Sequence, residues 1–535
     1  MEARGRFLTV AAGAVFLSAC SPPNDAPQAD IVLEQSALNF TLSQHQTACQ
    51  ADPRVQSGVV SLTDCVGADI FFRENFNGNG RTCGTCHRVE RNFTIDAPFI
   101  ARLPGSDALF IAENHADTLP LDNLEIPAQM RARGLILENV DGTQPEGPTV
   151  RFVLRAVPHT LSQGTSTTRP PGSINPPADR TGWSGDGAPG QGRLADFTNG
   201  AINQHFTRSL NRVAGTDFRV ATEDEGQAVA TFMRDVGRLN DIDLNNITFS
   251  DAGAETGRQR FLVVGCNACH GNASANVGGG NQNFFTGVEG VRSADLAGFP
   301  SDGGFSGFTG QSPPNPIGDG TFNVPPLIEA ADTGPFFHTD TQIIGAPAQN
   351  TSSAQTIEQA VAFYGSVAFN LGINADDIAN IARFLRATNA VLNIQMASNR
   401  IIGARNMGNV LGNVARVDRM QRRLAQMTLF ELDDAVRVLS GASSLNPAQA
   451  DRVRTARARI ETVVATPGTS TAAFNTRMTN LGNAFNDLDL ADSEISANVN
   501  FNIGNGTRMD CADPSTDGQP ATAPCFDPTL RTAAP

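Results

Sequence analysis

Apolar residues recur with the spacing of an amphipathic helix in several segments, most of which open with a capping residue. Asn374 precedes Asp377 by three residues, and a face of isoleucine, phenylalanine and leucine follows, as in a capped helix. Further helices are predicted over residues 255–265 and 446–465, and the capping box over 356–359 predicts a helix that contains Tyr364. No segment shows strong strand alternation. The pattern predicts a mainly α fold.

Two long stretches interrupt this helical pattern. Residues 163–193 and 272–322 are rich in glycine, proline and asparagine, and we expect long loops there. Charged residues make up only 17% of the chain, and the net charge is −15. That charge argues against a nucleic-acid partner and suits a soluble body that meets a basic electron-transfer protein.

The N-terminus has the pattern of an export signal. Arg4 and Arg6 precede an apolar stretch over 7–19 that is too short to span a bilayer as a mature helix. Small residues then lead into Cys20, as in a bacterial lipoprotein signal. We expect residues 1–19 to be removed, Cys20 to carry a lipid, and the protein to be anchored in the periplasm or cell envelope. The alternative is an ordinary secretory signal cleaved nearby.

The nine cysteines divide into three groups. Cys20 belongs to the lipoprotein signal, and four others lie in two CxxCH motifs. The remaining four form two pairs that are close in sequence, and in an oxidising compartment we expect two disulfides. The predicted disulfides are Cys49–Cys65 and Cys511–Cys525.

The two CxxCH motifs carry the clearest chemistry in the chain. In such a motif, two thiols three residues apart can bond to the vinyl groups of one haem, and the adjacent histidine then ligates the iron. A zinc half-site and a redox CxxC are the alternatives for a single motif, but two chance copies are not expected. We therefore predict two c-type haems, held by Cys83, Cys86 and His87 and by Cys266, Cys269 and His270.

Several further segments, taken in order, resemble the bacterial di-haem cytochrome c peroxidase and MauG superfamily. The resemblance covers roughly residues 60–392 and rests on GADIFFRENFNGNGRTCGTCHR, RFVLRAVPHTL, TGWSGDG, GRQRFLVVGCNACHG, FNVPPLIEAADTGPFFHTD, TIEQAVAFYGS and IANIARFLRATNA. It implies two cytochrome c-like haem domains. The expected organisation is a signal peptide (1–19), a tether (20–60), a peroxidatic domain (61–245), an electron-transfer domain (246–392) and a helical extension (393–535).

The resemblance also assigns roles to single residues. The haem at His87 would meet peroxide, and the haem at His270 would relay electrons. Trp183, the only tryptophan, corresponds to the residue between the two haems, and Tyr364, the only tyrosine, corresponds to the distal ligand of the second haem. A phenolic oxygen at that position favours oxidised iron. The alternative for both aromatic residues is an ordinary place in the packing.

The chain departs from the superfamily at three places. Ser184 replaces the usual aspartate after Trp183. Where peroxidases present a catalytic glutamate, this chain has Thr207, and His205 beside it is the nearest acid–base candidate. The resemblance further implies a calcium ion bound by the carbonyls of Thr333 and Pro335, but Ala156 replaces the expected asparagine ligand. By the same resemblance, His338 lies near the second haem and His115 is a candidate distal ligand of the first haem; the alternatives are structural hydrogen bonding and a surface position. For His159 a packing or loop role is favoured over catalysis, and His45 carries no signal.

These features favour an exported di-haem oxidoreductase that reduces hydrogen peroxide at the first haem, with electrons or holes relayed through the second. Its partner would be a small redox protein or a protein substrate. The alternatives are a di-haem oxygenase of a hydrophobic substrate and a non-catalytic electron carrier. The resemblance also suggests a homodimer, unless residues 393–535 cover that surface.

Overall fold

The computed structural model describes residues 40–113, 131, 134–138, 151–168, 179–182, 192–209, 212–277, 280–286, 322–337, 342–343, 354–441, 444–513, 525 and 527. They belong to one compact unit that runs from Ala37 to Pro535. Helices dominate this unit, which confirms the mainly α prediction. Several predictions fall outside the described residues: those for the segment 1–39 with Cys20, and those for His115, Trp183 and His338.

The described helices of the first half are short, apart from α1, α3, α9 and α10, which have eight residues or more. Helix α10 packs against α3 and α9, and α1 packs against α3. The first-half helices are α1 Leu42–Ala51, α2 Pro53–Gln56, α3 Leu62–Arg73, α4 Cys83–Cys86, η1 Val89–Arg91, α5 Ala97–Ile100, η2 Ala108–Glu113, α8 Gln163–Ser166, α9 Leu194–Ala201, η5 Ile202–Phe206 and α10 Glu223–Asp235. Of these, η5 is a π-helix that continues α9.

The second half contains the long helices. They and the shorter helices around them are α11 Ala252–Val263, η6 Cys266–Ala268, η7 Gly271–Ala273, η10 Ala330–Asp332, α12 Ile357–Ala362, η11 Phe363–Ala368, α13 Ala375–Leu411, α14 Ala415–Ser440, α15 Pro447–Val464, α16 Thr471–Ile495 and η12 Asn505–Arg508. The segment η11 is a second π-helix, and it continues α12.

Short antiparallel strands occur in several places, and β4, β5 and β6 lie within the segment 272–322 that was predicted to be a loop. The pairs are β1 Leu135–Glu138 with β2 Arg151–Ala156, β2 with β8 Gln342–Ile343, β3 Thr248–Phe249 with β9 Ser496–Ala497, β4 Asn276–Val277 with β5 Gly280–Asn281, and β6 Asn283–Phe284 with β7 Phe322–Asn323. Most have only two residues, which is why no alternation is visible in the sequence.

The predicted capping signals explain where the main helices begin. The side chain of Asn374 accepts from the backbone N–H of Asp377 (2.9 Å), and the Asp377 carboxylate accepts in return from that of Asn374 (3.1 Å). Helix α15 begins at Pro447 as predicted. The side chain of Asn446, however, donates to Ser250 (3.1 Å) and does not cap the helix.

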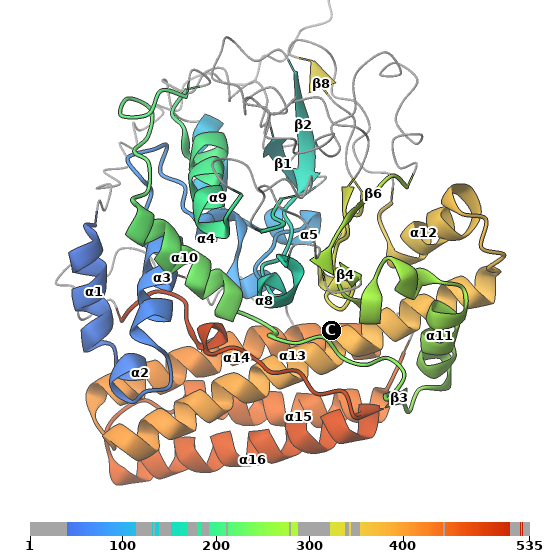
Figure 1. Ribbon diagram of the computed structural model, residues 1–535. Helices are drawn as coiled ribbons and strands as arrows, with labels where there is room; N and C mark the ends of the chain where they lie inside the picture. The colour runs from blue at the N-terminus through green and yellow to red at the C-terminus, as the bar shows by residue number, and fades with distance from the viewer. Residues whose placement is uncertain are drawn as a thin grey trace, which may run out of the picture. The chain divides into compact units, whose positions relative to one another are not determined.

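Helix α13 belongs to two packing environments. Its first half packs against α11, where the rings of Phe261 and Phe384 lie 5.5 Å apart. Its second half lies beside α14 and α16, and Arg400 forms a buried ion pair with Glu431 of α14 (2.7 Å). Figure 1 shows the helices α13–α16 side by side. The predicted boundary at 392/393 therefore falls inside a continuous helix, and the division into domains stays a prediction.

Both predicted disulfides are present. Cys49 and Cys65 join α1 to α3, with Cα atoms 5.7 Å apart, and Cys511 is bonded to Cys525, with Cα atoms 5.6 Å apart. Among the described residues, no helix combines the length and the apolar character needed to cross a bilayer.

A buried histidine that the sequence gave no reason to select joins α1 to α3. His45 is fully buried, with Nδ1 2.7 Å from a carboxylate oxygen of Asp69 and Nε2 3.7 Å from one of Glu74. Burial alone would lower the pKa of His45, but the hydrogen bond to Asp69 and the negative charges of Asp69 and Glu74 outweigh it and raise the pKa. Arg73 and Arg219 pair with the same carboxylates from the outer side.

We expect the stabilising effect of His45 to depend on pH. Because its folded pKa is raised, its contribution is fully present below the unfolded value of about 6.5 and is lost as the pH rises through the folded pKa. In urea titrations, His45→Gln should reduce the free energy of unfolding by roughly 1.5–3 kcal/mol at acidic pH, the contribution of a charged hydrogen bond, and by less at alkaline pH. A deficit that does not vary with pH would contradict this assignment.

Candidate functional site

The first CxxCH segment forms one helical turn, α4. The backbone N–H of His87 donates to the carbonyl oxygen of Cys83 (3.0 Å), so the turn closes on the histidine. Cys83 and Cys86 carry free thiols three residues apart on this turn. Burial raises the pKa of the Cys83 thiol to about 12, which keeps it protonated at neutral pH.

The imidazole of His87 is oriented by a carbonyl six residues further along. Its Nδ1 donates to the carbonyl oxygen of Phe93 (2.9 Å). A carbonyl can only accept, so the proton of this bond lies on Nδ1, and Nε2 keeps its lone pair. Burial lowers the pKa of His87 to about 4, so the ring is neutral at pH 7. A neutral imidazole fixed through one nitrogen is the usual state of a metal-ligating histidine.

The second CxxCH segment repeats this construction. Gly265, with φ of 89°, turns the chain from α11 into η6. The backbone N–H of His270 donates to the carbonyl of Cys266 (2.9 Å), and its Nδ1 donates to the carbonyl of Pro325 (3.0 Å). Burial lowers the pKa of His270 to about 4. Each segment therefore offers two thiols and one neutral, oriented imidazole, which fits a covalently attached haem.

Two further predicted site residues lie on the two π-helical segments. His205 lies on η5, and Tyr364 lies on η11. Each segment continues an α-helix and ends it, at Phe206 and Ala368. Widened turns of this kind occur often at functional sites, because they re-aim side chains that a regular helix would direct elsewhere. The sequence predicted a regular helix at Tyr364, and the extra width of its turn is a correction to that prediction.

Tyr364 lies within electrostatic range of Cys269, in the second CxxCH segment. Burial raises the pKa of its phenol, a hydrogen bond with Thr286 acts in the opposite direction, and the Cys269 thiol is close enough to raise it further. Three phenylalanine rings surround the phenol ring, at centroid distances of 5.3–6.1 Å: Phe337, Phe363 and Phe369. The only tyrosine is thus half-buried among phenylalanine rings, near the second CxxCH segment.

His205 and Thr207 are held by one asparagine. The Nδ2 of Asn79 donates to the carbonyl oxygens of His205 (3.0 Å) and Thr207 (3.1 Å), and the backbone N–H of Asn79 donates to the carbonyl of Phe206 (2.7 Å). Thr207 is fully buried, and its hydroxyl donates to the carbonyl of Ser209 (2.6 Å). That hydroxyl is therefore engaged in a local turn.

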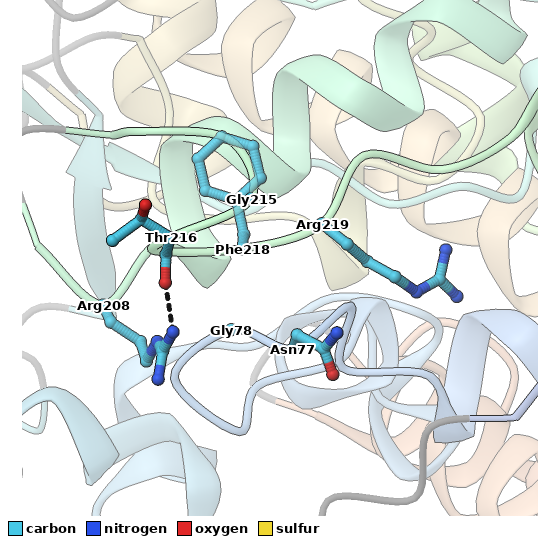
Figure 2. Close-up of a pocket in the computed structure, with 7 residues that line it drawn as sticks. All are labelled: Asn77, Gly78, Arg208, Gly215, Thr216, Phe218 and Arg219. Carbon is cyan, nitrogen blue, oxygen red and sulfur yellow. Dashed lines mark hydrogen bonds between the residues drawn. The ribbon is translucent and has the colours of Figure 1, made fainter.

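A polar pocket of about 320 Å³ lies next to this segment. Its lining residues, shown in Figure 2, are Asn77, Gly78, Arg208, Gly215, Thr216, Phe218 and Arg219. The guanidinium of Arg208 donates to the carbonyl of Thr216, and that of Arg219 pairs with Glu225 (2.8 Å). Both arginines are thus neutralised or hydrogen-bonded within the fold. Neither His205 nor Thr207 lines this pocket.

A chain of buried polar groups runs between the two CxxCH segments. His159 lies near His87, and its Nε2 is 3.7 Å from Glu329. Glu329 in turn accepts from Arg238 (2.6 Å), which also donates to Ser274 (3.3 Å), four residues after His270. Sequence reasoning gave His159 only a structural role and missed Arg238 and Glu329. No local signal identifies them, since their partners are far away in the sequence.

The residues predicted to hold calcium lie after η10. The hydroxyl of Thr333 donates to the carbonyl of Glu329 (2.5 Å), and Pro335 is buried. Within the described ranges, no group of three or more histidine, cysteine, aspartate or glutamate side chains is arranged to hold a metal ion. Calcium bound by backbone carbonyls stays a prediction.

Comparison of the chain with protein-family models, with curated proteins and with solved structures finds no match. The resemblance given above therefore stays a prediction based on the quoted motifs.

The pair Arg238–Glu329 should contribute strongly to stability. Both side chains are at most 1% exposed, so Arg238→Met would leave the Glu329 carboxylate buried without its cation. We expect a loss of roughly 3–5 kcal/mol in the free energy of unfolding, measured by urea titration. Arg454→Met, which removes the exposed pair with Asp451, is the matched control and should cost about 1 kcal/mol or less. Equal losses in the two variants would contradict the prediction.

Proposed function

We propose that this chain is an exported di-haem c-type oxidoreductase of the peroxidase or MauG type. The observation that carries the proposal is the repeated construction of the two CxxCH segments. In both, the histidine N–H closes on the first cysteine, and Nδ1 donates to a distant carbonyl, of Phe93 or of Pro325. A zinc half-site or a redox dithiol has no need of an oriented histidine directly after the second cysteine.

Each haem would be held by residues from one CxxCH segment: Cys83, Cys86 and His87 for the first, and Cys266, Cys269 and His270 for the second. When bound, haem iron supplies peroxide binding and one-electron transfer. The protein contributes the orientation of each imidazole and its neutral state. It also surrounds both histidines with enough protein to lower their pKa values to about 4.

Tyr364 is proposed as the distal ligand of the second haem. Its place beside Cys269, on a π-helical turn and among phenylalanine rings, supports this role. Burial raises the pKa of the free phenol, so the ligand would lose its proton only when a cation replaces it. Trp183, proposed to connect the two haems, lies outside the described residues.

One observation favours the oxygenase alternative. The segment 202–207 contains no carboxylate, and the Thr207 hydroxyl is already engaged with Ser209. Phe206 is buried, with its ring 6.0 Å from that of Phe76. A first haem facing this segment would have His205 as its nearest acid–base group and apolar surroundings otherwise. Slow peroxide cleavage with a stable oxygen complex would support this alternative.

The haem stoichiometry tests the proposal directly. Protein expressed with a working haem-attachment system should show two haems per chain in a pyridine haemochrome assay. Replacing Cys266 and Cys269 together with alanine should leave about one haem, because the thioether bonds of the second site are lost. The corresponding Cys83 and Cys86 double variant is the matched control. A colourless wild-type protein would contradict the proposal.

The role of Tyr364 is tested by replacing its phenol side chain with the thioether side chain of methionine. Tyr364→Met should raise the midpoint potential of one haem by on the order of 0.1–0.3 V, part of the roughly 0.8 V range that axial ligands span. Spectroelectrochemical titration measures this change. Phe369→Leu, which removes a ring stacked on Tyr364 but leaves the phenol, should shift the potential far less. Unchanged spectra in Tyr364→Met would show that Tyr364 is not a ligand.

A further inference from the structure

The loop that orients His87 has an unusual backbone conformation. Asn92 and Phe93 both lie in the left-handed region, with φ of 52° and 57°. Residues other than glycine adopt this region at a cost, and two in succession persist only where the surroundings hold them. The reversal brings the N–H of Phe93 to the carbonyl of Arg88 (2.8 Å) and its carbonyl to Nδ1 of His87. The orientation of His87 therefore depends on whatever holds this turn.

A single carboxylate from the helical extension contacts the turn. Asp434, on α14, accepts from Arg91 through Oδ1 (2.8 Å) and from the side-chain amide of Asn92 through Oδ2 (2.8 Å). All three side chains are buried, and Arg91 is further fixed by Asp96. The two oxygens of the Asp434 carboxylate thus accept hydrogen bonds from the two residues that precede Phe93, one oxygen for each residue.

The same helix also reaches the second site. Arg437, one turn after Asp434, pairs with Asp434 (3.2 Å) and with Asp332. Asp332 accepts from Asn389 of α13 (2.6 Å) and lies seven residues after Pro325, whose carbonyl orients His270. The ion-paired chain Arg91–Asp434–Arg437–Asp332 therefore connects the segments that carry both orienting carbonyls.

We propose that Asp434 is a positioning residue for the first haem site, acting through the Arg91–Asn92 turn on the carbonyl that orients His87. The proposal rests on the proposed function for the presence of haem at His87. It gives residues 393–535 a part in the site that the resemblance, which ends near residue 392, does not supply. Asp434 acts through other residues and contacts no reacting atom.

Hydrogen exchange in the turn tests the proposal without depending on enzymatic activity. In the purified full-length protein, Asp434→Ala should increase the amide exchange rate of the peptide covering 88–94 by at least about tenfold, because the left-handed turn loses its support. Asp434→Asn keeps one acceptor oxygen and the side-chain volume, and should produce a smaller increase.

The neighbouring Asp433 provides the matched control. It is also buried on α14, but it pairs with Arg457 of α15 (2.5 Å) and not with the turn. Asp433→Ala should destabilise the bundle and leave exchange in 88–94 unchanged. Equal exchange increases in the two variants, or none in Asp434→Ala, would overturn the proposal. If Asp434→Ala fails to fold, Asn92→Gly replaces it, since glycine allows φ of 52° while removing the amide that contacts Asp434.

A second measurement separates this proposal from the proposed function. In haem-loaded protein, Asp434→Ala should change the paramagnetic resonance signal and the midpoint potential of one haem only, and Asp433→Ala should change neither. Protein without haem would contradict the proposed function, while the exchange result would still decide the role of Asp434 in the turn. Loaded protein with unaltered signals and unaltered exchange would overturn the positioning role alone.

Discussion

The two CxxCH segments share one kind of hydrogen bond, from Nδ1 of the histidine to a backbone carbonyl, and this bond sets the direction of each imidazole. A CxxCH sequence brings two thiols and an imidazole together, but it does not decide where the imidazole points. In each segment the orientation of the imidazole is fixed by the carbonyl of a residue outside the motif. This residue is Phe93 for His87 and Pro325 for His270. The bond also fixes the tautomer, which leaves Nε2 as the nitrogen available to a metal.

Each orienting carbonyl is in turn held by distant parts of the chain. The Phe93 carbonyl follows a left-handed turn that contacts α14, and the Pro325 carbonyl belongs to a segment whose later residues, Glu329 and Asp332, form buried ion pairs. Charges in such positions are costly to bury alone and are stable only in matched sets. Two of these buried pairs, Arg238–Glu329 and Arg91–Asp434, lie next to the segments that carry the orienting carbonyls.

Features encoded locally could be predicted from the sequence. The two CxxCH motifs, the cap at Asn374, the start of α15 at Pro447 and both disulfides required only short spacing or the counting of cysteines. The rest depends on contacts between remote residues. Arg91 and Asp434 are 343 positions apart, and Arg238 and Glu329 are 91 apart, so nothing in either neighbourhood marks the partner. The buried position of His45 could likewise not be predicted, because its partners Asp69 and Glu74 come close to it only in the folded chain.

The continuity of α13 changes how the extension is understood. Residues 393–535 were expected to be an addition to two haem domains, but a helix of 37 residues crosses the expected boundary without a break. The first half of α13 packs on α11, the helix that precedes the second CxxCH segment. The second half of α13 packs on α14, and Asp434 of α14 contacts the turn that follows the first CxxCH segment. A rigid helix transmits the placement of one end to the other, because its backbone hydrogen bonds fix the rise per residue. The bundle therefore contacts the turn that orients His87 through Asp434, and it reaches the segment that follows Pro325 through Arg437.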